Sequence, residues 1–302
     1  MGRLHDREKV GITACCALLG RTKQAYHKRL KSIEKSSLGD ELILKHVLEI
    51  RKEQPVLGGR KLYHLLGKLL PAGLLPGRDA FFKLLELNGL LIRRRKVPKP
   101  TTTLSWHHYH KYGNLYKGRI PGRPNEVWVT DITYLRLEGG GFLYLSLVTD
   151  AYSHKVIGWY LSESLCMDGP LEALRMALPR LVPGHSLTHH SDRGVQYCSH
   201  AYVSLLQSHG ISISMTEDGD PRENAVAERV NGILKEEWLN RESISSLAHG
   251  RALVDKAIAI YNDKRPHMSI DYLTPYEADQ QEGELKRRWR ASYKKKEDIT
   301  TI

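Results

Sequence analysis

The stretch VWVTDITYLRLEGGGFLYLSLVTDAYSHKVIGWYL, residues 127–161, decides the fold. Its β-branched and aromatic residues predict three strands, at Val127–Leu137, Phe142–Thr149 and Val156–Leu161. The glycines at 139–141 and the polar segment at 150–155 separate these strands and are short enough for hairpin connections. We therefore expect three consecutive antiparallel strands at the start of a sheet.

The residues after this stretch alternate between helix and strand patterns. Apolar periodicity predicts helices near Asp168–Leu181 and His200–His209, and short strands near Leu187–His190 and Ile211–Met215. Three antiparallel strands followed by alternating helix and strand is the order of a ribonuclease-H-like α/β domain. We expect a mixed five-stranded sheet flanked by helices.

The N-terminal third is predicted to be all-helical. Ile12–Leu30 reads as two short helices joined at Gly20, with Thr22 as N-cap of the second, which is a helix-turn-helix pattern. The expected divisions are a helix-turn-helix-like segment at 1–35, a helical DNA-binding domain at 36–92, a basic linker at 93–122, the α/β core at 123–285 and a basic tail at 286–302.

The composition indicates a globular protein with a polyanionic partner. Lys and Arg number 46 against 34 Asp and Glu, which gives a net charge of +12 and favours nucleic acid. The apolar runs are too short for a membrane span, and the N-terminus lacks a secretory apolar region, so a cytoplasmic protein is expected. The four cysteines form no C-x-x-C pair and predict neither disulfides nor a zinc site.

Two basic groups are candidate DNA contacts. The first is the predicted second helix of the helix-turn-helix, with Lys23, Lys28 and Arg29, and the second is the linker, with Arg93, Arg94 and Arg95. A solvated basic helix face and a solubilising linker are the alternatives, because charge runs commonly need no partner.

Asp131 interrupts an otherwise apolar and β-branched strand. The alternating set Val127, Val129, Asp131, Thr133 and Leu135 shares one face of that strand. Burying a charged carboxylate among core-type residues costs on the order of several kcal/mol of folding free energy unless it is paired, hydrogen-bonded or bound to metal. A metal site and a buried ion pair both remain open for this residue.

Asp192 follows the predicted strand ending at His190 and precedes Arg193 and Gly194. It is therefore expected at the carboxyl end of a strand, where sites in open α/β sheets usually lie. A simple turn aspartate is the alternative, since Asp and Gly are common in turns.

Glu228 lies on a helix predicted to begin at Asp220, with Pro221 at its first position and Glu223 closing a capping box. Helical spacing places Asn224, Glu228, Asn231 and Lys235 on one polar face that can meet metal and DNA. The alternative is the solvated side of an amphipathic helix. Rival carboxylates for the third site residue are Glu217, Asp218, Asp220 and Glu223, and Asp150 is a further rival with a structural role expected.

Together the three carboxylates form a recognisable spacing. Sixty residues separate Asp131 from Asp192, and thirty-five separate Asp192 from Glu228. This spacing resembles the Asp, Asp, thirty-five residues, Glu signature of transposases and retroviral-type integrases. The flanking strings are WVTDITYL, HHSDRGVQYCS and SMTEDGDPRENAVAERVNGILKEEW, and the segment YNDKRPHMSIDYLTPYEA, residues 261–278, resembles the closing segment of the same family.

The resemblance is to bacterial insertion-sequence transposases whose second reading frame encodes an integrase-like core. It implies catalytic and metal-binding roles for Asp131, Asp192 and Glu228, and a contact of Lys235 with the DNA terminus. Arg193, Asn224 and Asn231 are expected to contribute further DNA contacts. Glu223-Asn224 departs from the family's usual Asp-Asn, and Leu57-Gly58-Gly59 departs from its Tyr-Gly pair.

The expected chemistry is metal-dependent cleavage and joining of DNA. Two metal ions activate the attacking oxygen and stabilise the leaving oxygen, and carboxylate oxygens suit Mg²⁺, with Mn²⁺ as a substitute. The expected partners are DNA, as element ends and target, further copies of the chain and a product of an upstream reading frame. A DNA-binding regulator without catalysis and a nuclease that only hydrolyses are the alternatives.

Overall fold

The computed structural model describes residues 12–18, 20–92, 108–217 and 223–288, so Arg93, Arg94 and Arg95 lie outside the described residues. The chain divides into two compact units, one made of Met1–Glu53 and Leu57–Arg93 and the other of Gln54–Val56 and Arg94–Ile302. Among the described residues, the structure contains no helix that is both long and apolar enough to cross a membrane.

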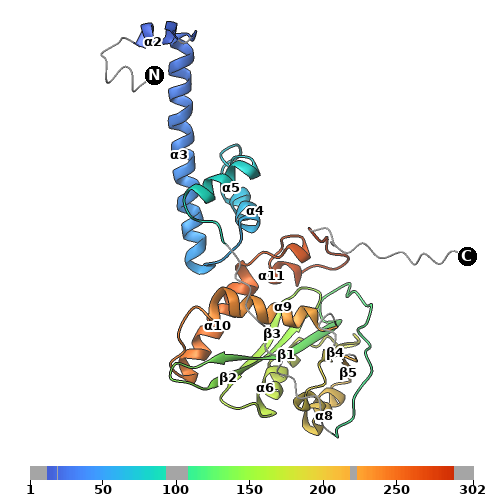
Figure 1. The fold of residues 1–302 in the computed structure, drawn as a ribbon. Helices are drawn as coiled ribbons and strands as arrows, with labels where there is room; N and C mark the ends of the chain where they lie inside the picture. The colour runs from blue at the N-terminus through green and yellow to red at the C-terminus, as the bar shows by residue number, and fades with distance from the viewer. Residues whose placement is uncertain (1–11, 19, 93–107, 218–222, 289–302) are drawn as a thin grey trace, which may run out of the picture. The chain divides into compact units, whose positions relative to one another are not determined.

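The first unit is helical (Figure 1). Its helices are α2 (Ile12–Leu18), α3 (Lys23–Glu53), α4 (Gly59–Leu69) and α5 (Arg78–Leu87). Val47 of α3, Leu66 of α4 and Phe81 of α5 are fully buried in one apolar cluster. The all-helical prediction for this region is confirmed.

The expected boundary between residues 35 and 36 falls inside α3. Thr22 caps this helix as predicted, because its Oγ1 accepts the N–H of Ala25 at 3.1 Å. The helix then continues to Glu53, since the sequence from Lys23 to Glu53 contains no proline and Gly39 as its one glycine. The predicted short second helix of a helix-turn-helix is therefore the first part of a much longer helix.

The second unit is built on a five-stranded sheet in the order β3-β2-β1-β4-β5. Its strands are β1 (Val127–Arg136), β2 (Phe142–Asp150), β3 (Val156–Ser162), β4 (Thr188–Ser191) and β5 (Ser212–Met215). β1, β2 and β3 pair antiparallel, whereas β1 with β4 and β4 with β5 pair parallel. The predicted mixed sheet is confirmed, and every strand end lies within one residue of its predicted position.

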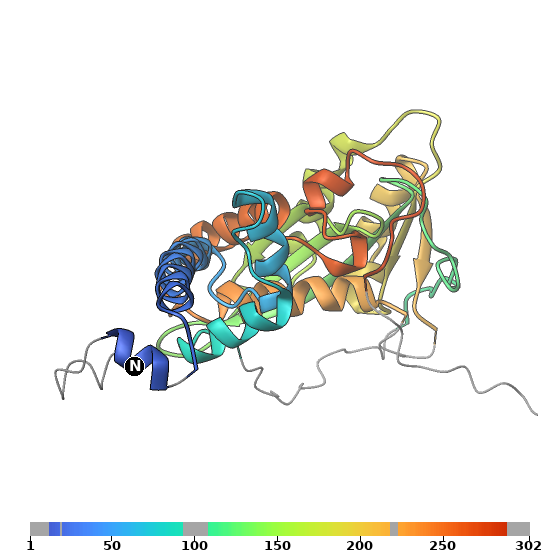
Figure 2. The same cartoon turned by 90° about the horizontal axis from the view of Figure 1, so that it is seen from above.

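Helices cover both faces of this sheet (Figures 1 and 2). They are α6 (Asp168–Ala177), α7 (Val195–Cys198), α8 (His200–Ser208), α9 (Ala225–Leu234), α10 (Leu247–Lys264) and α11 (Pro275–Ala278), and the π-helix η2 (Lys235–Leu239) extends α9. The apolar residues of α9 and α10 pack in one core cluster, and those of α6 and α8 pack in another. A Cβ at Gly158 of β3 would lie 2.1 Å from the carbonyl oxygen of Ala173, so the close packing of α6 requires glycine there.

Residues 108–122, expected to belong to the linker, pack against β5 instead. The carbonyl of Gly113 accepts the N–H of Met215 at 3.2 Å, and the N–H of Leu115 donates to Ser214 Oγ at 2.9 Å. The linker prediction rested on weak apolar periodicity, and these contacts are made by backbone groups, which leave no periodic signal.

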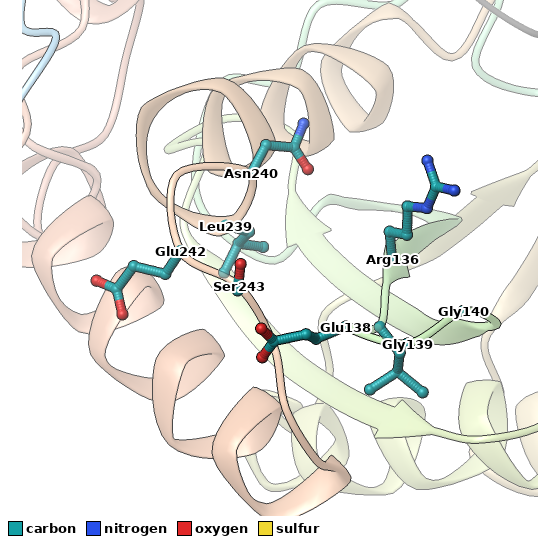
Figure 3. Close-up of a pocket in the computed structure, with 9 residues that line it drawn as sticks. Arg136, Glu138, Gly139, Gly140, Leu239, Asn240, Glu242 and Ser243 are labelled. Atoms are coloured by element: carbon teal, nitrogen blue, oxygen red, sulfur yellow. The ribbon is translucent and has the colours of Figure 1, made fainter.

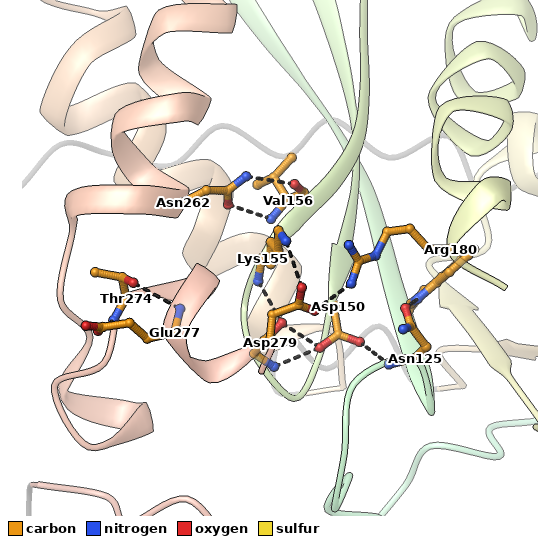
Figure 4. Close-up of polar contacts among 11 residues, drawn as sticks. Asn125, Asp150, Lys155, Val156, Arg180, Asn262, Thr274, Glu277 and Asp279 are labelled. Atoms are coloured by element: carbon orange, nitrogen blue, oxygen red, sulfur yellow. Dashed lines mark hydrogen bonds and ion pairs between the residues drawn. The ribbon is translucent and has the colours of Figure 1, made fainter. Parts of the chain in front are cut away.

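The end of the chain is tied to the sheet through a cluster of charges shown in Figure 4. Asp279, directly after α11, accepts from Lys155 Nζ at 2.7 Å and from Arg180 Nη2 at 2.6 Å. We call Asp279, Lys155 and Arg180 the Asp279 cluster. Nearby, Asn262 of α10 donates to and accepts from the backbone of Val156. α11 is thereby held against the edge strand of the sheet.

Candidate active site

The parallel pairing of β1 and β4 brings two of the predicted carboxylates to the same edge. Val129 lies opposite His190 in this ladder. Asp131 and Asp192 each follow two residues later, so the register places them side by side where β4 ends. The carboxyl end of β4 is thus a meeting point for two residues that are far apart in sequence.

Asp131 is half-buried and lies close enough to Asp192, Glu228 and Lys235 to interact with their charges. Its Oδ1 accepts the N–H of Ile132 at 2.9 Å, and its Oδ2 accepts Asn231 Nδ2 at 2.8 Å. Burial, followed by the negative charge of Asp192 and, more weakly, that of Glu228, raises the pKa of Asp131 to about 7. The Asn231 and Ile132 hydrogen bonds oppose this rise. The site therefore favours an added positive charge.

Asp192 begins the turn that follows β4. Its Oδ1 accepts the N–H of Gly194 at 3.0 Å, and its carbonyl accepts the hydroxyl of Ser191 at 2.9 Å. A Cβ at Gly194 would approach Asp192 Oδ1 to 3.0 Å, so glycine leaves room for this carboxylate. The sequence leaves open whether Asp192 is a turn residue or a site residue. It is in a turn, and this turn holds its carboxylate beside β1.

α9 is held along β1 by side chains on one face. Asn224 Nδ2 donates to the carbonyl of Thr130 at 2.9 Å, Asn231 bonds Asp131, and Lys235 Nζ donates to Thr133 Oγ1 at 3.1 Å. Glu228 lies between Asn224 and Asn231 at helical spacing and shares this face. Its charge reaches Asp131, as the raised pKa of that residue records.

The predicted start of this helix is wrong. α9 begins at Ala225 with Asn224 as N-cap. Glu223, predicted to close a capping box, accepts the N–H of Glu217 at 2.7 Å through its Oε2. Asp218 and Asp220 lie outside the described residues.

Two residues predicted to contact DNA are buried against β1. Asn224 is 6% exposed and Asn231 is 5% exposed, and both use their amide nitrogens within the protein. Both residues thus position α9 and Asp131, and their expected role as DNA contacts stays a prediction.

The other predicted DNA contacts are placed as follows. Lys235 is half-buried, its Nζ lies 4.3 Å from the centre of the Tyr134 ring, and burial lowers its pKa against the opposing charge of Asp131. Arg193 Nη1 donates to the carbonyl of Glu217 at 2.9 Å. Lys23, Lys28 and Arg29 are exposed on α3 in the first unit, where Lys23 and Lys28 line a shallow depression with Gln24 and His27.

A layer of neutral histidines supports β4, and the sequence analysis did not identify it. Ser214 Oγ accepts the N–H of Leu115 and lies 2.8 Å from His190 Nδ1. His189 Nε2 lies 2.8 Å from the Tyr202 hydroxyl. Burial lowers the pKa of His190 to about 4 and that of His189 to about 3. Consecutive histidines in a predicted strand were the one available signal, because they must point to opposite faces.

The rival carboxylates have structural contacts. Asp150 is fully buried and accepts from the N–H of Asn125 at 2.8 Å and from both the N–H and the hydroxyl of Ser153. Glu217 accepts the N–H of Asn114 at 3.0 Å. Asp150 is thus an organiser of the β2–β3 turn, as expected.

The donor atoms at the β1–β4 edge suit a hard divalent cation. Carboxylate oxygens are the preferred ligands of Mg²⁺, and the mutual repulsion recorded by Asp131 is relieved by positive charge. Among the described residues, no group of three or more His, Cys, Asp or Glu side chains is gathered closely enough to hold a metal ion. The carboxylate oxygens at this edge fit Mg²⁺ by their chemistry. We expect that metal binding draws these carboxylates closer together.

A mixed sheet in this order, with acidic residues at its β1–β4 edge, defines an integrase-type catalytic core. Two family models described as integrase core domain match the chain, one at residues 121–221 and one at residues 209–275.

The relatives define the family more closely. The chain is 28% identical over 282 residues to the transposase for insertion sequence element IS629 of Shigella sonnei, covering 90% of this chain and 93% of the relative. It is 31% identical over 210 residues to a 31 kDa protein of insertion element IS600 of Shigella sonnei, covering 69% of this chain and 76% of the relative. It is 37% identical over 155 residues to the putative transposase InsK for IS150 of Escherichia coli, covering 51% of this chain and 54% of the relative.

The chain belongs to the family of bacterial insertion-sequence transposases with an integrase core domain. Transposition is its function, and neither a regulator without catalysis nor a nuclease that only hydrolyses is favoured. Among solved structures, the HTLV-2 integrase catalytic core domain in complex with magnesium is similar at 20% identity, with a TM-score of 0.42, over 53% of this chain and 100% of that one.

Proposed function

We propose that Asp131, Asp192 and Glu228 are the catalytic residues of DNA cleavage and strand transfer. The observation that carries the proposal is the parallel register of β1 and β4, which brings Asp131 and Asp192 to one strand end. The raised pKa of Asp131, to which the charges of Asp192 and Glu228 contribute, agrees with it. The α9 contacts to Thr130, Asp131 and Thr133 support it, because they fix the helix that carries Glu228 on the edge of β1.

The same three residues would hold divalent metal, with two Mg²⁺ ions as the expected complement and Mn²⁺ as a substitute. Bound ions would activate the attacking oxygen and stabilise the charge on the leaving oxygen. Asp131, Asp192 and Glu228 would hold the ions together through their carboxylate oxygens. Asn231 orients the Asp131 carboxylate through its 2.8 Å hydrogen bond.

Two displacements at phosphorus account for the reaction. In the first, water attacks the phosphodiester, the bond from phosphorus to the 3′ oxygen breaks, and that oxygen leaves as a 3′ hydroxyl. In the second, this hydroxyl attacks a target phosphodiester, forming a new phosphorus–oxygen bond while the target's own 3′ oxygen leaves. Each step forms one phosphorus–oxygen bond and breaks one. The first consumes a water and leaves a 5′ phosphomonoester beside the 3′ hydroxyl, and the second exchanges one phosphodiester for another and passes the proton of the attacking hydroxyl to the departing 3′ oxygen.

A covalent enzyme intermediate is not part of this proposal. Tyr197 is buried, and burial raises the pKa of its hydroxyl well above the ordinary value. The Ser191 hydroxyl donates to the Asp192 carbonyl, and the Ser199 hydroxyl donates to the Gln196 carbonyl. None of these hydroxyls is paired with a base that would activate it as a nucleophile.

The DNA partners are the ends of the element and a target duplex. Lys235 and Arg193 flank the carboxylates and would contact phosphates there, and Lys23, Lys28 and Arg29 would contact DNA from the first unit. Arg93, Arg94 and Arg95 keep the same proposed role. Joining two ends in one event calls for several copies of the chain, and the similar HTLV-2 catalytic core is described in trimeric and dimeric forms. An upstream-frame product is a further proposed partner.

The test is incubation of the purified protein with labelled DNA from its element's ends, with Mg²⁺ or with chelator. We expect metal-dependent 3′ cleavage and joining that Glu228→Gln abolishes. Glu236→Gln is the matched control, because Glu236 is an exposed carboxylate on η2, which continues α9. Full joining by Glu228→Gln would refute the assignment. Binding without cleavage by the wild-type protein would point to the upstream partner.

A further inference from the structure

Among the described residues, one stretch of β1 next to the proposed site has no strand paired to it on the β4 side. The β1–β4 ladder covers Val127–Val129, whereas the β1–β2 ladder continues to Arg136. At the far end, Leu137 bridges Ile244, and the N–H of Glu138 donates to the Ile244 carbonyl at 2.8 Å. The part of β1 between these two pairings begins at the proposed active site and runs to the hairpin tip.

Aromatic rings and cations alternate along this stretch. The Tyr134 ring lies under Lys235 Nζ at 4.3 Å and meets the Phe142 ring edge-on, with centroids 5.2 Å apart. Phe142 is 46% exposed although it is a large apolar residue in a strand. Arg136, opposite Phe142 in the ladder, is exposed as well. We call Lys235, Tyr134, Phe142 and Arg136 the aromatic strip.

The Arg136 side chain at the hairpin tip is placed so that its positive charge can meet a ligand. A cavity of about 600 Å³ lies between the tip and the residues after η2, and Arg136, Glu138 and Glu242 are among the residues that line it. In Figure 3 the Arg136 side chain points away from the carboxylates of Glu138 and Glu242. Among the ion pairs of the described residues, Glu138 and Glu242 do not neutralise Arg136. The guanidinium is therefore placed to meet an anion.

We infer that the aromatic strip binds unpaired nucleotides of the DNA next to the cleaved bond, by stacking bases on Tyr134 and Phe142. The half-buried Tyr134 ring and the exposed Phe142 ring lie next to Lys235 and Arg136. Accessible rings beside cations are the chemistry of single-strand binding, in which rings meet base faces and cations meet phosphates. Paired bases of a duplex already stack on one another and present only their edges. The strip therefore selects nucleotides that have left the duplex.

The position of the strip fixes which nucleotides it takes. The inference rests on the proposed active site at Asp131. Tyr134 lies three residues further along β1, about 10 Å at the usual rise of a strand, and its side chain leaves the opposite face of the strand from Asp131. Lys235 joins the two faces at this edge, because its Nζ donates to Thr133 Oγ1 and lies over the Tyr134 ring. The rise of about 10 Å corresponds to roughly three base steps of a DNA strand. The bases held on the strip are therefore those within about three nucleotides of the cut.

The chain offers a matched control for the strip. Tyr276 is 52% exposed, and Lys155 Nζ lies 5.0 Å from the centre of its ring. This is the same pairing of a tyrosine with a lysine, in the Asp279 cluster region rather than at the β1 edge. Tyr276→Ala removes an equivalent pair and is expected to leave DNA handling unchanged.

Photocrosslinking tests the contact directly. Element-end DNA would carry 5-iododeoxyuridine at single positions up to three nucleotides on either side of the cut, on each strand, bound to full-length protein carrying Asp192→Asn to prevent turnover. We expect mass spectrometry to find crosslinks at Tyr134 or Phe142, lost in Tyr134→Ala/Phe142→Ala and retained in Tyr276→Ala. Crosslinks confined to other residues, or to the paired bases far from the cut, would overturn the inference.

Joining assays test the selection of unpaired nucleotides. Tyr134→Ala/Phe142→Ala is expected to lower joining of fully paired ends about 5- to 100-fold, the range for one stacked base. Mismatches that unpair the three terminal nucleotides should restore joining to within about threefold. Tyr134→Phe keeps the ring and should join like the wild type. Equal losses on paired and unpaired ends, with the thermal unfolding midpoint unchanged, would show that the strip does not act on unpaired bases.

The outcomes separate this inference from the assignment of the site. If Asp192→Asn joins DNA normally, the proposed active site is wrong whatever the crosslinks show. If Asp192→Asn is inactive and the strip neither crosslinks nor affects joining, the site stands and the strip inference fails.

Discussion

Two acidic sites in the second unit differ in what surrounds the carboxylate. The Asp279 side chain is 3% exposed and meets Lys155 and Arg180, so cations of the protein neutralise it. Asp131 is held by an asparagine and a backbone N–H, and the carboxylates of Asp192 and Glu228 raise its pKa. The nearby Lys235 ammonium donates to Thr133 rather than to Asp131. A carboxylate with its own cations stabilises the fold. One placed among like charges gains most from a cation that arrives with the reaction.

The largest contrast between the two sites is expected in joining activity. Asp192→Asn removes a proposed metal ligand and one negative charge while keeping the size of the side chain. We expect strand transfer to fall by at least about a thousandfold, measured as joined product from labelled element ends. DNA binding, measured by fluorescence anisotropy, should stay within about twofold to threefold of the wild type.

Asp279→Asn is the comparison for this loss. Corrected for the folded fraction, its joining rate should match that of the wild-type protein. A loss of joining per folded molecule in Asp279→Asn as large as that in Asp192→Asn would erase the distinction between the sites.

Stability should respond in the opposite sense. Asp279→Ala leaves Lys155 and Arg180 without their shared partner, and Arg180 is 29% exposed while Lys155 is 15% exposed. Breaking a buried pair on one side typically costs about 3–5 kcal/mol, and we expect about 3 kcal/mol here because the cations reach solvent. Urea unfolding measures the loss, and Glu236→Gln serves as the surface control. A cost below about 1 kcal/mol would mean that the cluster contributes little.

The strands could be predicted from the sequence, and much of the site could not. Alternation at Val127–Leu135 and the glycines at 139–141 are local signals, and they placed the hairpins correctly. The start of α9 depends on Asn224 and the Thr130 carbonyl, which are 94 residues apart, so the local capping signature at Asp220 was misleading. Likewise, nothing local to Asn231 predicts its bond to Asp131, 100 residues away.

The repulsion at Asp131 predicts a pH dependence. The pKa of Asp131 is raised from 3.8 to about 7, so the folded protein holds this proton more tightly than the unfolded chain. Its contribution to stability is therefore lost as the pH rises from about 4 to 7 and stays absent above that range. Asp131→Asn removes the penalty. In chelator at pH 8 the variant should be about 2 kcal/mol more stable than the wild type, a figure reduced because the side chain is partly exposed.

Urea unfolding at a series of pH values checks this prediction. The advantage of Asp131→Asn should shrink steadily between pH 7 and pH 5. Asp150→Asn is the comparison, because Asp150 accepts three hydrogen bonds and its replacement breaks a turn rather than relieving repulsion. A variant that is less stable than the wild type at pH 8 would show that Asp131 is stabilised by its surroundings.

The smallest effect is expected at the cap of α11. Thr274 Oγ1 accepts the N–H of Glu277 at 3.1 Å, and Glu277 Oε2 accepts the N–H of Thr274 at 2.8 Å. Thr274→Ala should cost about 1 kcal/mol in urea unfolding, and Thr274→Ser should recover most of it. Because α11 leads directly into Asp279, the cap and the Asp279 cluster hold one segment. The double variant Thr274→Ala/Asp279→Ala should therefore lose less stability than the sum of the two single losses. Once one substitution has detached α11, the second removes a contact that no longer stabilises the fold. Strictly additive losses would show that the Thr274 cap and the Asp279 cluster stabilise different parts of the chain. Joining activity per folded molecule should be unchanged in all three variants.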